Sequence, residues 1–520
     1  MTFFAASSGE IFAEARVTAI EDHDFSLGKL SSSVGTGICF LDHMIDQFTS
    51  HAMVGVTLRC GTKGGDAKNS CAFAPLQDYA TGMKDRPHDR DIFIACGSAL
   101  GLALRALVEK VVSTVGSEAP CRGGRVVFCA PLDESFSEAA IDVLPVEDRK
   151  GSCAVSLEPY GTFAGGGAGR RWVGRYRTDL TPAFWTALAA AMQSDVSLRK
   201  IRGGNAHHQL ESAFKSFARA LRAALDRMVD GGSHGCAEPS AAPRAPAGPC
   251  AEPRVADRQR ATKETSIEIR VNLDSPWRFE DPPQGFMAAW TGKWTTASTL
   301  RATLQHTSRI KTGIRVLDDI LVEFAKAAGV EIVIHCEGDR HIDDHHTAED
   351  VAITLGQCFH EALGDKAGCV RMGCAEGESN GARVRAVLDL SNRPHFESNL
   401  PLDEEYVGHG DGAPHPAEPP AKKARLDGEA AEEGGTPAPC DALCGALLSC
   451  EMLFHVLNSF TLEMRSSCHL ELLKDDGAPG HTLDLALAAA RAYGSALSRA
   501  ARVDPRRGGA VASSKGTLSK

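Results

Sequence analysis

Two segments of the sequence combine histidine and carboxylate side chains at a spacing that suits a metal ion. In the segment Asp344–Asp350, His345 and Glu349 are four residues apart, so a helix would place both side chains on one face. His346 is rotated by about 100° from His345 on such a helix and would reach a different place. Imidazole and carboxylate groups bind zinc, iron or manganese. The alternative is a polar helix start, capped by Asp344, with incidental histidines.

The second segment, Asn205–Glu211, repeats this spacing with His207, His208 and Glu211 at the start of another expected helix. The recurrence of the pattern in one chain strengthens the prediction of metal binding at both places. The order of residues differs from the His-Glu-x-x-His pattern of zinc peptidases, so a peptidase is not indicated. The spacing by itself does not choose among the metals.

A repeat organises the rest of the chain. Residues 35–44 match residues 311–320, and Ala/Leu-rich stretches of helical character follow Gly97 and Gly356. A stretch rich in glycine, alanine and proline lies between the two halves and predicts a linker over residues 230–257. We therefore predict two copies of one unit, copy one over residues 8–229 and copy two over residues 258–520, with an insertion in copy two at about residues 402–440.

Each copy mixes strand and helix patterns. Ser266–Leu273 and Val330–Cys336 alternate polar and apolar residues, which is typical of a half-buried strand. Leu317–Ala328, Ala348–Leu363 and Ala213–Met228 have helical spacing instead. The expected fold class is therefore α+β.

Composition narrows the class of protein further. The chain has 520 residues, of which 43% are hydrophobic and 24% are charged, and its net charge is −11. It lacks the broad basic surface of a nucleic-acid-binding protein. It has neither a signal-peptide pattern nor an uninterrupted apolar run of about 18 residues. We expect a cytoplasmic protein that binds neither nucleic acid nor a membrane.

Taken together, the motifs resemble the imidazoleglycerol-phosphate dehydratase family of histidine biosynthesis. The segments that carry the resemblance are Thr36–Met44, Asn205–Lys215, Arg260–Thr265, Asp344–Asp350, Asp389–Pro394 and Ser513–Gly516. The resemblance implies a unit of two half-domains, each a four-stranded sheet covered by helices, of the ribosomal protein S5 domain 2-like class. It also implies a large homo-oligomer with two manganese ions in each complete site, between neighbouring units.

The resemblance implies a set of eight metal ligands, and neither copy carries the full set. The ligands that remain are His43, His207, His208 and Glu211 in copy one, and His345, His346, Glu349 and His469 in copy two. The residues at the lost positions are Arg86, Pro87, Arg90 and Arg199 in copy one, and Asp319, Leu483, Asp484 and Leu487 in copy two. Because the losses are complementary, we predict one complete site, shared where copy one meets copy two.

The same resemblance implies roles around the metals. Glu264 is the predicted acid/base residue, and Gln47 is predicted to position the substrate. The predicted phosphate ligands are Arg371, Arg393, Lys215, Ser514 and Lys515. Pro131–Glu134 is interpreted as structural. The implied substrate is a phosphorylated imidazole, D-erythro-imidazoleglycerol phosphate, which loses water to give imidazoleacetol phosphate.

Two other hypotheses stay open at this point. One is a catalytically dead scaffold or regulatory paralogue that keeps the fold, and the other is a different metal-dependent hydrolase on the same fold. Bound manganese favours the dehydratase, whereas a protein without metal favours the scaffold.

Overall fold

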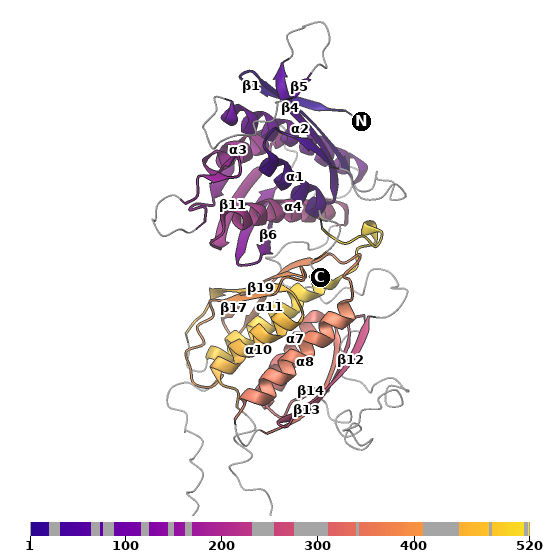
Figure 1. Ribbon diagram of the computed structural model, residues 1–520, viewed down its shortest axis with the longest axis vertical. Helices are drawn as coiled ribbons and strands as arrows, with labels where there is room; N and C mark the ends of the chain where they lie inside the picture. Colours follow the sequence, from indigo (N-terminus) through magenta and orange to yellow (C-terminus); the bar gives the residue numbers. More distant parts are fainter. Residues whose placement is uncertain are drawn as a thin grey trace, which may run out of the picture.

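Two copies of one α+β unit make up the folded chain (Figure 1). The computed structural model describes residues 2–19, 32–63, 73–75, 88–115, 124–143, 150–161, 169–230, 254–274, 310–339, 343–408, 447–477, 481–513 and 518. Copy one runs from Phe4 to Asp230 and copy two begins at Val255. The predicted tandem duplication is therefore confirmed.

Copy one contains four α-helices and eleven strands within the described residues. Its strands are β1 (Phe4–Ser8), β2 (Ile11–Ala19), β3 (Ser33–Gly35), β4 (Val54–Lys63), β5 (Phe73–Pro75), β6 (Arg125–Leu132), β7 (Ser135–Asp142), β8 (Cys153–Ser156), β9 (Trp172–Val173), β10 (Tyr176–Arg177) and β11 (Asp195–Arg202). Its helices are α1 (Cys39–Ala52), α2 (Asp89–Val115), the 3₁₀ turn η3 (Thr178–Leu180), α3 (Thr181–Met192) and α4 (Ala206–Asp230).

Copy two repeats this order of elements. Its strands are β12 (Val255–Ala261), β13 (Thr265–Asn272), β14 (Ile310–Lys311), β15 (Glu331–Gly338), β16 (Met372–Ser379), β17 (Ala382–Asp389), β18 (His395–Ser398) and β19 (Ser467–Lys474). Its helices are α7 (Arg315–Ala328), α8 (His345–Leu363), α10 (Cys450–Glu463), α11 (His481–Ala501) and the 3₁₀ turn η4 (Pro505–Arg507).

Each copy has two sheets with one shared topology. The strand orders are β1-β2-β4-β3 and β6-β7-β11-β8 in copy one, and β12-β13-β15-β14 and β16-β17-β19-β18 in copy two. In every sheet the last strand of the order pairs in parallel and the other strands pair antiparallel. The prediction of two half-domains per unit is confirmed, with two additions in copy one: β5 adds a fifth strand to the first sheet, and β9 and β10 form a separate two-stranded sheet.

The helices of each copy lie between its two sheets (Figure 1). In copy one α2 packs on β1 and β2, whereas α4 packs on β6 and β7. In copy two α8 covers β12 and β13, whereas α11 covers β16 and β17. The sequence explains the packing of α1, where Leu41, Met44, Ile45 and Phe48 follow a helical period and are all buried.

The repeated Thr-Gly-Ile segment forms the same turn in both copies. Gly37 and Gly313 have φ angles of 81° and 90°, a region that glycine enters without steric cost. In copy one the Thr36 hydroxyl donates a hydrogen bond of 2.5 Å to Asp42. The turn therefore fixes where α1 begins, at Cys39, one helical turn before the predicted ligand His43.

The boundaries of the copies differ from those predicted by composition. Strand β1 begins at Phe4, before the predicted start at residue 8, because residues 4–8 pair with β2. Strand β12 begins at Val255, inside the predicted linker 230–257, because it pairs with β13. The described residues 402–408 of the predicted insertion belong to copy two, where Tyr406 pairs with Ser449. Residues 231–253 and 409–446 lie outside the described residues.

The second sheets of the two copies face each other and form the junction of the chain (Figure 1). Strand β6 of copy one contacts β16, β17 and β19 of copy two. Met372, Cys374 and Val387 of copy two belong to the apolar cluster that forms the core of copy one. Arg385, with a side chain only 9% exposed, crosses the junction to Glu138 at 2.7 Å. Shared apolar packing and a buried ion pair thus hold the copies together.

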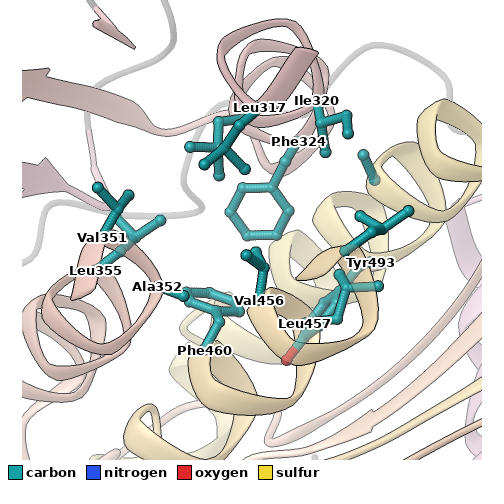
Figure 2. Close-up of a pocket in the computed structure, with 13 residues that line it drawn as sticks. Leu317, Ile320, Phe324, Val351, Ala352, Leu355, Val456, Leu457, Phe460 and Tyr493 are labelled. Carbon is teal, nitrogen blue, oxygen red and sulfur yellow. The ribbon is translucent and has the colours of Figure 1, made fainter. Parts of the chain in front are cut away.

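A small cavity of about 30 Å³ lies among α7, α8, α10 and α11 in copy two (Figure 2). The ring of Phe324 projects toward it, and the hydroxyl of Tyr493 hydrogen-bonds to Thr461 at 2.9 Å. The surface of the cavity is apolar, without the few convergent polar groups of a ligand site. We interpret it as a packing gap in the core.

Helix α2 is long and apolar enough to cross a membrane by length and composition alone. Most of its side chains, Phe93 and Leu104 among them, are buried inside copy one. A core helix passes the same test, so the finding is weak evidence for a membrane.

Candidate metal centres and the junction of the two copies

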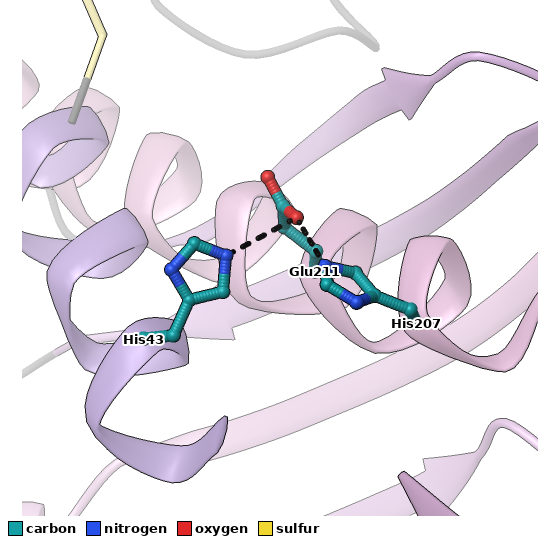
Figure 3. Close-up of side chains that lie close together, drawn as sticks. All are labelled: His43, His207 and Glu211. Atoms are coloured by element: carbon teal, nitrogen blue, oxygen red, sulfur yellow. Dashed lines mark hydrogen bonds and ion pairs between the residues drawn. The ribbon is translucent and has the colours of Figure 1, made fainter. Parts of the chain in front are cut away.

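The first candidate metal centre joins α1 to the start of α4 (Figure 3). Nε2 of His207 lies 3.1 Å from a carboxylate oxygen of Glu211, and Nε2 of His43 lies 3.7 Å from the same oxygen. The ligand atoms of these three residues all lie within 4.8 Å of one another. The structure therefore brings three of the four predicted ligands of copy one together.

The sequence positions these side chains through a helix cap. The side-chain oxygen of Asn205 accepts hydrogen bonds from the backbone N–H groups of His207 and His208 at 2.9 and 3.4 Å. Asparagine is among the preferred residues before the first turn of a helix because it satisfies such N–H groups. The cap starts α4 at Ala206, so that the spacing of His207 and Glu211 brings them onto one face.

Glu211 also forms an ion pair beneath the histidines. Its second carboxylate oxygen lies 2.7 Å from Nζ of Lys215, whose side chain is 2% exposed. Burial alone would raise the pKa of Glu211, but the Lys215 ammonium and the hydrogen bonds from His207 and His43 hold it far below its ordinary value. Lys215 therefore balances the Glu211 charge in this structure. Gln47, the residue predicted to position the substrate, is buried one turn after His43 on α1.

His208 points away from His207 toward the turn between β6 and β7. Its Nδ1 lies 2.8 Å from Glu134, and its Nε2 lies 3.8 Å from Asp133. Burial alone would raise the pKa of Glu134, but the hydrogen bond with His208 and further hydrogen bonds lower it overall. Asp133 and Glu134, which the sequence had suggested were structural, thus contact a predicted ligand.

The second candidate metal centre lies in copy two, between α8 and α10. Nε2 of His345 lies 3.4 Å from Glu349, as the four-residue spacing predicts. His346 is turned away from Glu349, as predicted, and its Nδ1 lies 3.0 Å from Asp339. The hydrogen bond with Asp339 raises the pKa of His346 above its ordinary value. The predicted acid/base residue Glu264 lies 3.9 Å from Nε2 of His346 and is half exposed.

His455 on α10 completes this second group, and the sequence motifs had not identified it. Its Nε2 lies 3.0 Å from Glu349, and the ligand atoms of His345, Glu349 and His455 all lie within 4.8 Å of one another. The sequence around His455 has no histidine pair, and its one carboxylate at the four-residue spacing is Glu451, so the segment did not stand out as a metal motif. The signal that could have found it is its position on a helix that must pack beside α8.

His469, the predicted strand ligand, lies at the junction of the two copies. Its side chain is fully buried in β19, and its Nε2 lies 2.7 Å from the backbone oxygen of Asp133 in copy one. Arg393 reaches the carboxylate of the same Asp133 at 3.2 Å. The junction therefore brings His208 of copy one near His469 and Arg393 of copy two, with Asp133 between them.

The strand register corrects two of the assigned counterparts. His469 pairs with Val387 of β17, and in copy one the residue at the same register position is Ser197, which pairs with Ala140 of β7. The predicted counterpart Arg199 lies two residues further and pairs with Glu138 instead. Both copies have a β-bulge at the same place in this strand, so the bulge is not the cause, and the counterpart is fixed only by the pairing with the neighbouring strand.

The turn after β6 also has a different counterpart from the one predicted. Asp133 and Glu134 correspond to Asn380 and Gly381, the turn between β16 and β17, and not to residues 375–378. Asp133 and Asn380 both have positive φ angles, of 50° and 39°. In copy two Asn380 donates a hydrogen bond of 3.0 Å to Asp484, the residue at the lost histidine position.

Three of the lost ligand positions of copy one, Arg86, Pro87 and Arg90, fall near the start of α2 in the sequence. Arg86 and Pro87 lie outside the described residues, and Arg90 is exposed in the first turn of α2. Arginine cannot release its proton to bind a metal. The described part of this region therefore supports the prediction that copy one lost the first histidine motif.

A group of buried cations lies on both sides of the junction. Lys215 of copy one and Arg371 and Arg507 of copy two are buried cations, and Arg219 of copy one is half-buried. The buried His51 lies among them, and their charges act on its ring. Arg371 forms a two-point ion pair with Asp389 at 2.7 and 2.8 Å and donates a third hydrogen bond to the backbone oxygen of Ala512. The predicted phosphate ligands Lys215 and Arg371 are thus brought together, whereas Ser514 and Lys515 lie outside the described residues.

Several nitrogen atoms in this group have no hydrogen-bond partner among the described residues. They are both ring nitrogens of His51, Nε of Arg219, and Nε and Nη2 of Arg507. A buried donor without a partner costs about 1–3 kcal/mol, and more when it is charged. An anion bound at the junction would satisfy these donors.

His51 gives a prediction about acid stability. The pKa of His51 is held well below its ordinary value of 6.5, mainly by burial and secondly by the positive charges of Lys215 and Arg371. Below that pH the unfolded chain takes up a proton at His51 that the folded chain excludes, so stability falls by as much as about 1.4 kcal/mol per pH unit. We expect urea denaturation in buffer without phosphate to show this loss between pH 6.5 and 5.5, and His51→Gln to show a smaller slope. An unchanged slope in the variant would contradict the assignment.

The residues present fit a metal ion. Each group offers two imidazoles and one carboxylate, a ligand set that suits manganese, iron or zinc. Within the described residues, every hydrogen bond and ion pair of His345, His346 and Glu349 stays inside copy two. The two groups are therefore separate centres in a single chain.

Comparisons with known proteins agree with a duplicated unit. Residues 87–221 and 312–414 match the sequence profile of imidazoleglycerol-phosphate dehydratase. The imidazoleglycerol-phosphate dehydratase of Pyricularia oryzae is 33% identical over 270 residues, which cover 52% of this chain and 99% of the relative. That of Neurospora crassa is 35% identical over 267 residues, covering 51% and 96%. A crystal structure of the enzyme from Staphylococcus aureus aligns with a TM-score of 0.28 at 19% identity, covering 42% of this chain and 96% of that chain.

The fold and the two histidine–carboxylate groups define a duplicated α+β enzyme of the hydro-lyase class. The chain belongs to the imidazoleglycerol-phosphate dehydratase family, as a tandem fusion of two diverged copies. The match spans nearly the whole length of each relative but only about half of this chain. This is the result expected when the chain contains the unit twice. The resemblance inferred from the sequence is confirmed.

Proposed function

We propose that the chain catalyses the manganese-dependent dehydration of D-erythro-imidazoleglycerol phosphate to imidazoleacetol phosphate in histidine biosynthesis. The observation that carries the proposal is the complementary retention of ligands. Copy one keeps His207 and Glu211 with His43, and copy two keeps His345 and Glu349, so the two copies retain different halves of one ligand set. Random decay of an inactive protein gives no reason for that division.

Manganese supports this reaction because two bound cations lower the pKa of an imidazole ring between them and stabilise its electron-rich form. The side chains that would hold the ions are those of the two candidate centres, with His208, His346 and His469 as further ligands. Glu264 stands beside His346, where its half-exposed carboxylate is free to take a proton from the substrate carbon chain. Gln47, buried one turn after His43, is proposed to help to orient the substrate.

The phosphate end of the substrate fits the buried cations of the junction. Lys215 and Arg371 come from different copies and are both less than 7% exposed. The unpaired guanidinium nitrogens of Arg219 and Arg507 supply the directed donors that a phosphate oxygen accepts, and the neutral His51 ring can add one N–H. Arg393, which contacts Asp133 across the junction, is proposed as a further phosphate ligand.

The complete site needs a second chain. Within one chain the junction gathers His208, His469, Lys215 and Arg371, whereas the group around Glu349 contacts only copy two. We propose that copy two of a neighbouring chain supplies His345, His346, Glu349 and Glu264 to the junction. Such a site differs from one made by the two copies of a single chain. It requires at least two chains, in line with the prediction of a homo-oligomer.

The test is turnover by the full-length purified chain. After treatment with a chelator, the protein should convert imidazoleglycerol phosphate to imidazoleacetol phosphate only when manganese is returned. Metal content measured by mass spectrometry on the same sample separates the alternatives. A folded protein that binds manganese without turnover, or binds no metal, would support the scaffold hypothesis instead.

A further inference from the structure

An open hollow of about 530 Å³ lies in copy two at the ends of α8 and α10, two helices that lie side by side (Figure 1). A volume of this size is typical of small-molecule sites. The hollow includes no residue of either histidine group. In contrast to the apolar gap of Figure 2, its lining is mostly polar or charged: Arg258 from β12, Gln357, His360 and Glu361 from α8, and Glu463 and Arg465 at the end of α10.

The hollow exists because α8 and α10 end earlier than their counterparts in copy one. Gly97 on α2 and Gly356 on α8 hold equivalent places against the neighbouring helix. A Cβ on Gly97 would lie 2.4 Å from the backbone oxygen of Phe184, and one on Gly356 would lie 2.7 Å from that of Phe460. Beyond this contact, α2 and α3 each continue at least one turn further than α8 and α10.

One helical turn after this contact the two copies differ. In copy one a second glycine, Gly101, faces α3, and a Cβ on it would lie 2.4 Å from the backbone oxygen of Leu188. The helices α2 and α3 therefore stay in close contact there. In copy two the residue at this place is His360, which lines the hollow. The space that α3 fills in copy one is open in copy two.

Two side chains of the lining have unused hydrogen-bonding groups. Nδ1 of His360 is buried and has no hydrogen-bond partner in the part of the chain that the structure describes. Buried polar atoms without a partner are rare in proteins and often mark a place where a ligand or water binds. Arg465 is exposed, and its guanidinium forms no ion pair or hydrogen bond with the described residues.

Positive charge dominates around these groups. Lys366 is buried nearby and donates a hydrogen bond of 3.2 Å to the backbone oxygen of Arg465. Burial lowers the pKa of Lys366 to about 8, so its ammonium group is still charged at pH 7. Arg258, 3.3 Å from Glu361, is the third cation. Burial, followed by the charges of Lys366, Arg465 and Arg258, lowers the pKa of His360, which leaves its ring neutral.

We propose that this hollow binds a small organic oxyanion, a carboxylate or a phosphate ester, at a place separate from the phosphate-binding cations of the junction. The guanidinium of Arg465 offers two parallel N–H donors, which match two oxygens of either group. His360 adds a hydrogen bond from Nδ1 and so gains the partner that it lacks. The carboxylates of Glu361 and Glu463 accept hydrogen bonds from hydroxyl or ammonium groups on the rest of the ligand.

Anion binding to the full-length, chelator-treated chain tests the proposal. Succinate and inorganic phosphate are titrated in separate calorimetric experiments. Hydrogen–deuterium exchange on the same samples locates each anion, because phosphate also has the cations of the junction to bind. We expect at least one of the two anions to slow the exchange of backbone amides in residues 357–366 and 460–466. Arg465→Gln should weaken this binding about 10- to 100-fold, the loss expected for charge-assisted hydrogen bonds.

Two further variants separate binding from stability. His360→Leu removes the unpaired buried nitrogen, so we expect its thermal unfolding temperature to be unchanged or higher while anion binding weakens. A side chain with only a structural role would not give that combination. Arg383→Gln is the matched control, because Arg383 is an arginine of copy two that is 46% exposed and lies outside the hollow. It should bind the anion like the unmodified chain.

Protection of the two segments by succinate alone identifies a carboxylate ligand, and protection by phosphate alone identifies a phosphate ester. Protection by both supports the shared chemistry. The proposal is wrong if neither anion protects these segments in the unmodified chain. It is equally wrong if the protection persists unchanged in folded Arg465→Gln and His360→Leu proteins. Neither measurement depends on turnover, so the proposed function can fail while this site stands.

Discussion

Two single variants, His43→Ala and His346→Ala, are each expected to be inactive and to regain activity when they are assembled together. His43 belongs to the centre on copy one, and His346 lies beside the centre on copy two, with no described contact between the two. If copy two of one chain completes the site on another, a mixed oligomer contains some sites with both histidines intact. With random assembly of equal amounts, about one quarter of the sites are complete.

The experiment uses co-expression of two differently tagged chains and tandem purification of the mixed oligomer. His43→Ala combined with His207→Ala is the control, because both changes damage copy one and no mixed site escapes damage. Size-exclusion chromatography shows that all mixtures assemble like the unmodified protein. An assembled but inactive mixture of His43→Ala with His346→Ala would show that the site lies within one chain.

Replacing Glu211 with glutamine is expected to reduce both metal binding and stability. Glu211 contacts His43, His207 and Lys215, and Lys215 is 2% exposed. Removing the carboxylate charge leaves a buried ammonium group without its partner, which costs about 3 kcal/mol or more. The pKa of Glu211 is held far below its ordinary value of 4.5, so the ion pair is present at neutral pH. Its contribution to stability decreases only as the pH falls below about 4.5, where the unfolded chain takes up a proton at Glu211. Urea denaturation at pH 7.5 measures the loss.

Glu349→Gln is the matched control for this prediction. Glu349 has the same place in its histidine group, but its side chain is 33% exposed and its described partners are histidines only. We expect it to lose metal affinity while its free energy of unfolding changes by less than about 1 kcal/mol. Adding Lys215→Met to Glu211→Gln should recover part of the lost stability, because it removes the buried charge. Equal stability of the two single variants would refute the assigned role of Lys215.

The local part of both metal centres could be predicted from the sequence. The four-residue spacing in His207–Glu211 and in His345–Glu349 is a property of one helix, and both pairs form as expected. The opposite direction of His346 follows from the same helical geometry. The repeat, two strands and three helices were also predicted, because they depend on patterns within each copy.

Three features of the site could not be predicted in this way. His455 joins Glu349 from a helix about 100 residues later, and no motif surrounds it. The counterpart of His469 is Ser197 and not Arg199, because the pairing of each strand with its neighbour sets the register. The turn at Asp133 was interpreted as structural because local spacing does not reveal its contacts. His208 reaches it from α4, and His469 reaches it from the other copy.

The sequence by itself determined the family, the duplication, and which ligand types each copy retains. Those properties are encoded by residue identity and by spacing along single helices, where geometry is nearly fixed. The tertiary structure decided which side chains meet. It pairs the second sheets of the two copies, gathers Lys215 and Arg371 with other buried cations, and keeps the group around Glu349 apart from copy one. Those choices depend on the packing of surfaces formed by residues far apart in the chain, which local patterns do not specify.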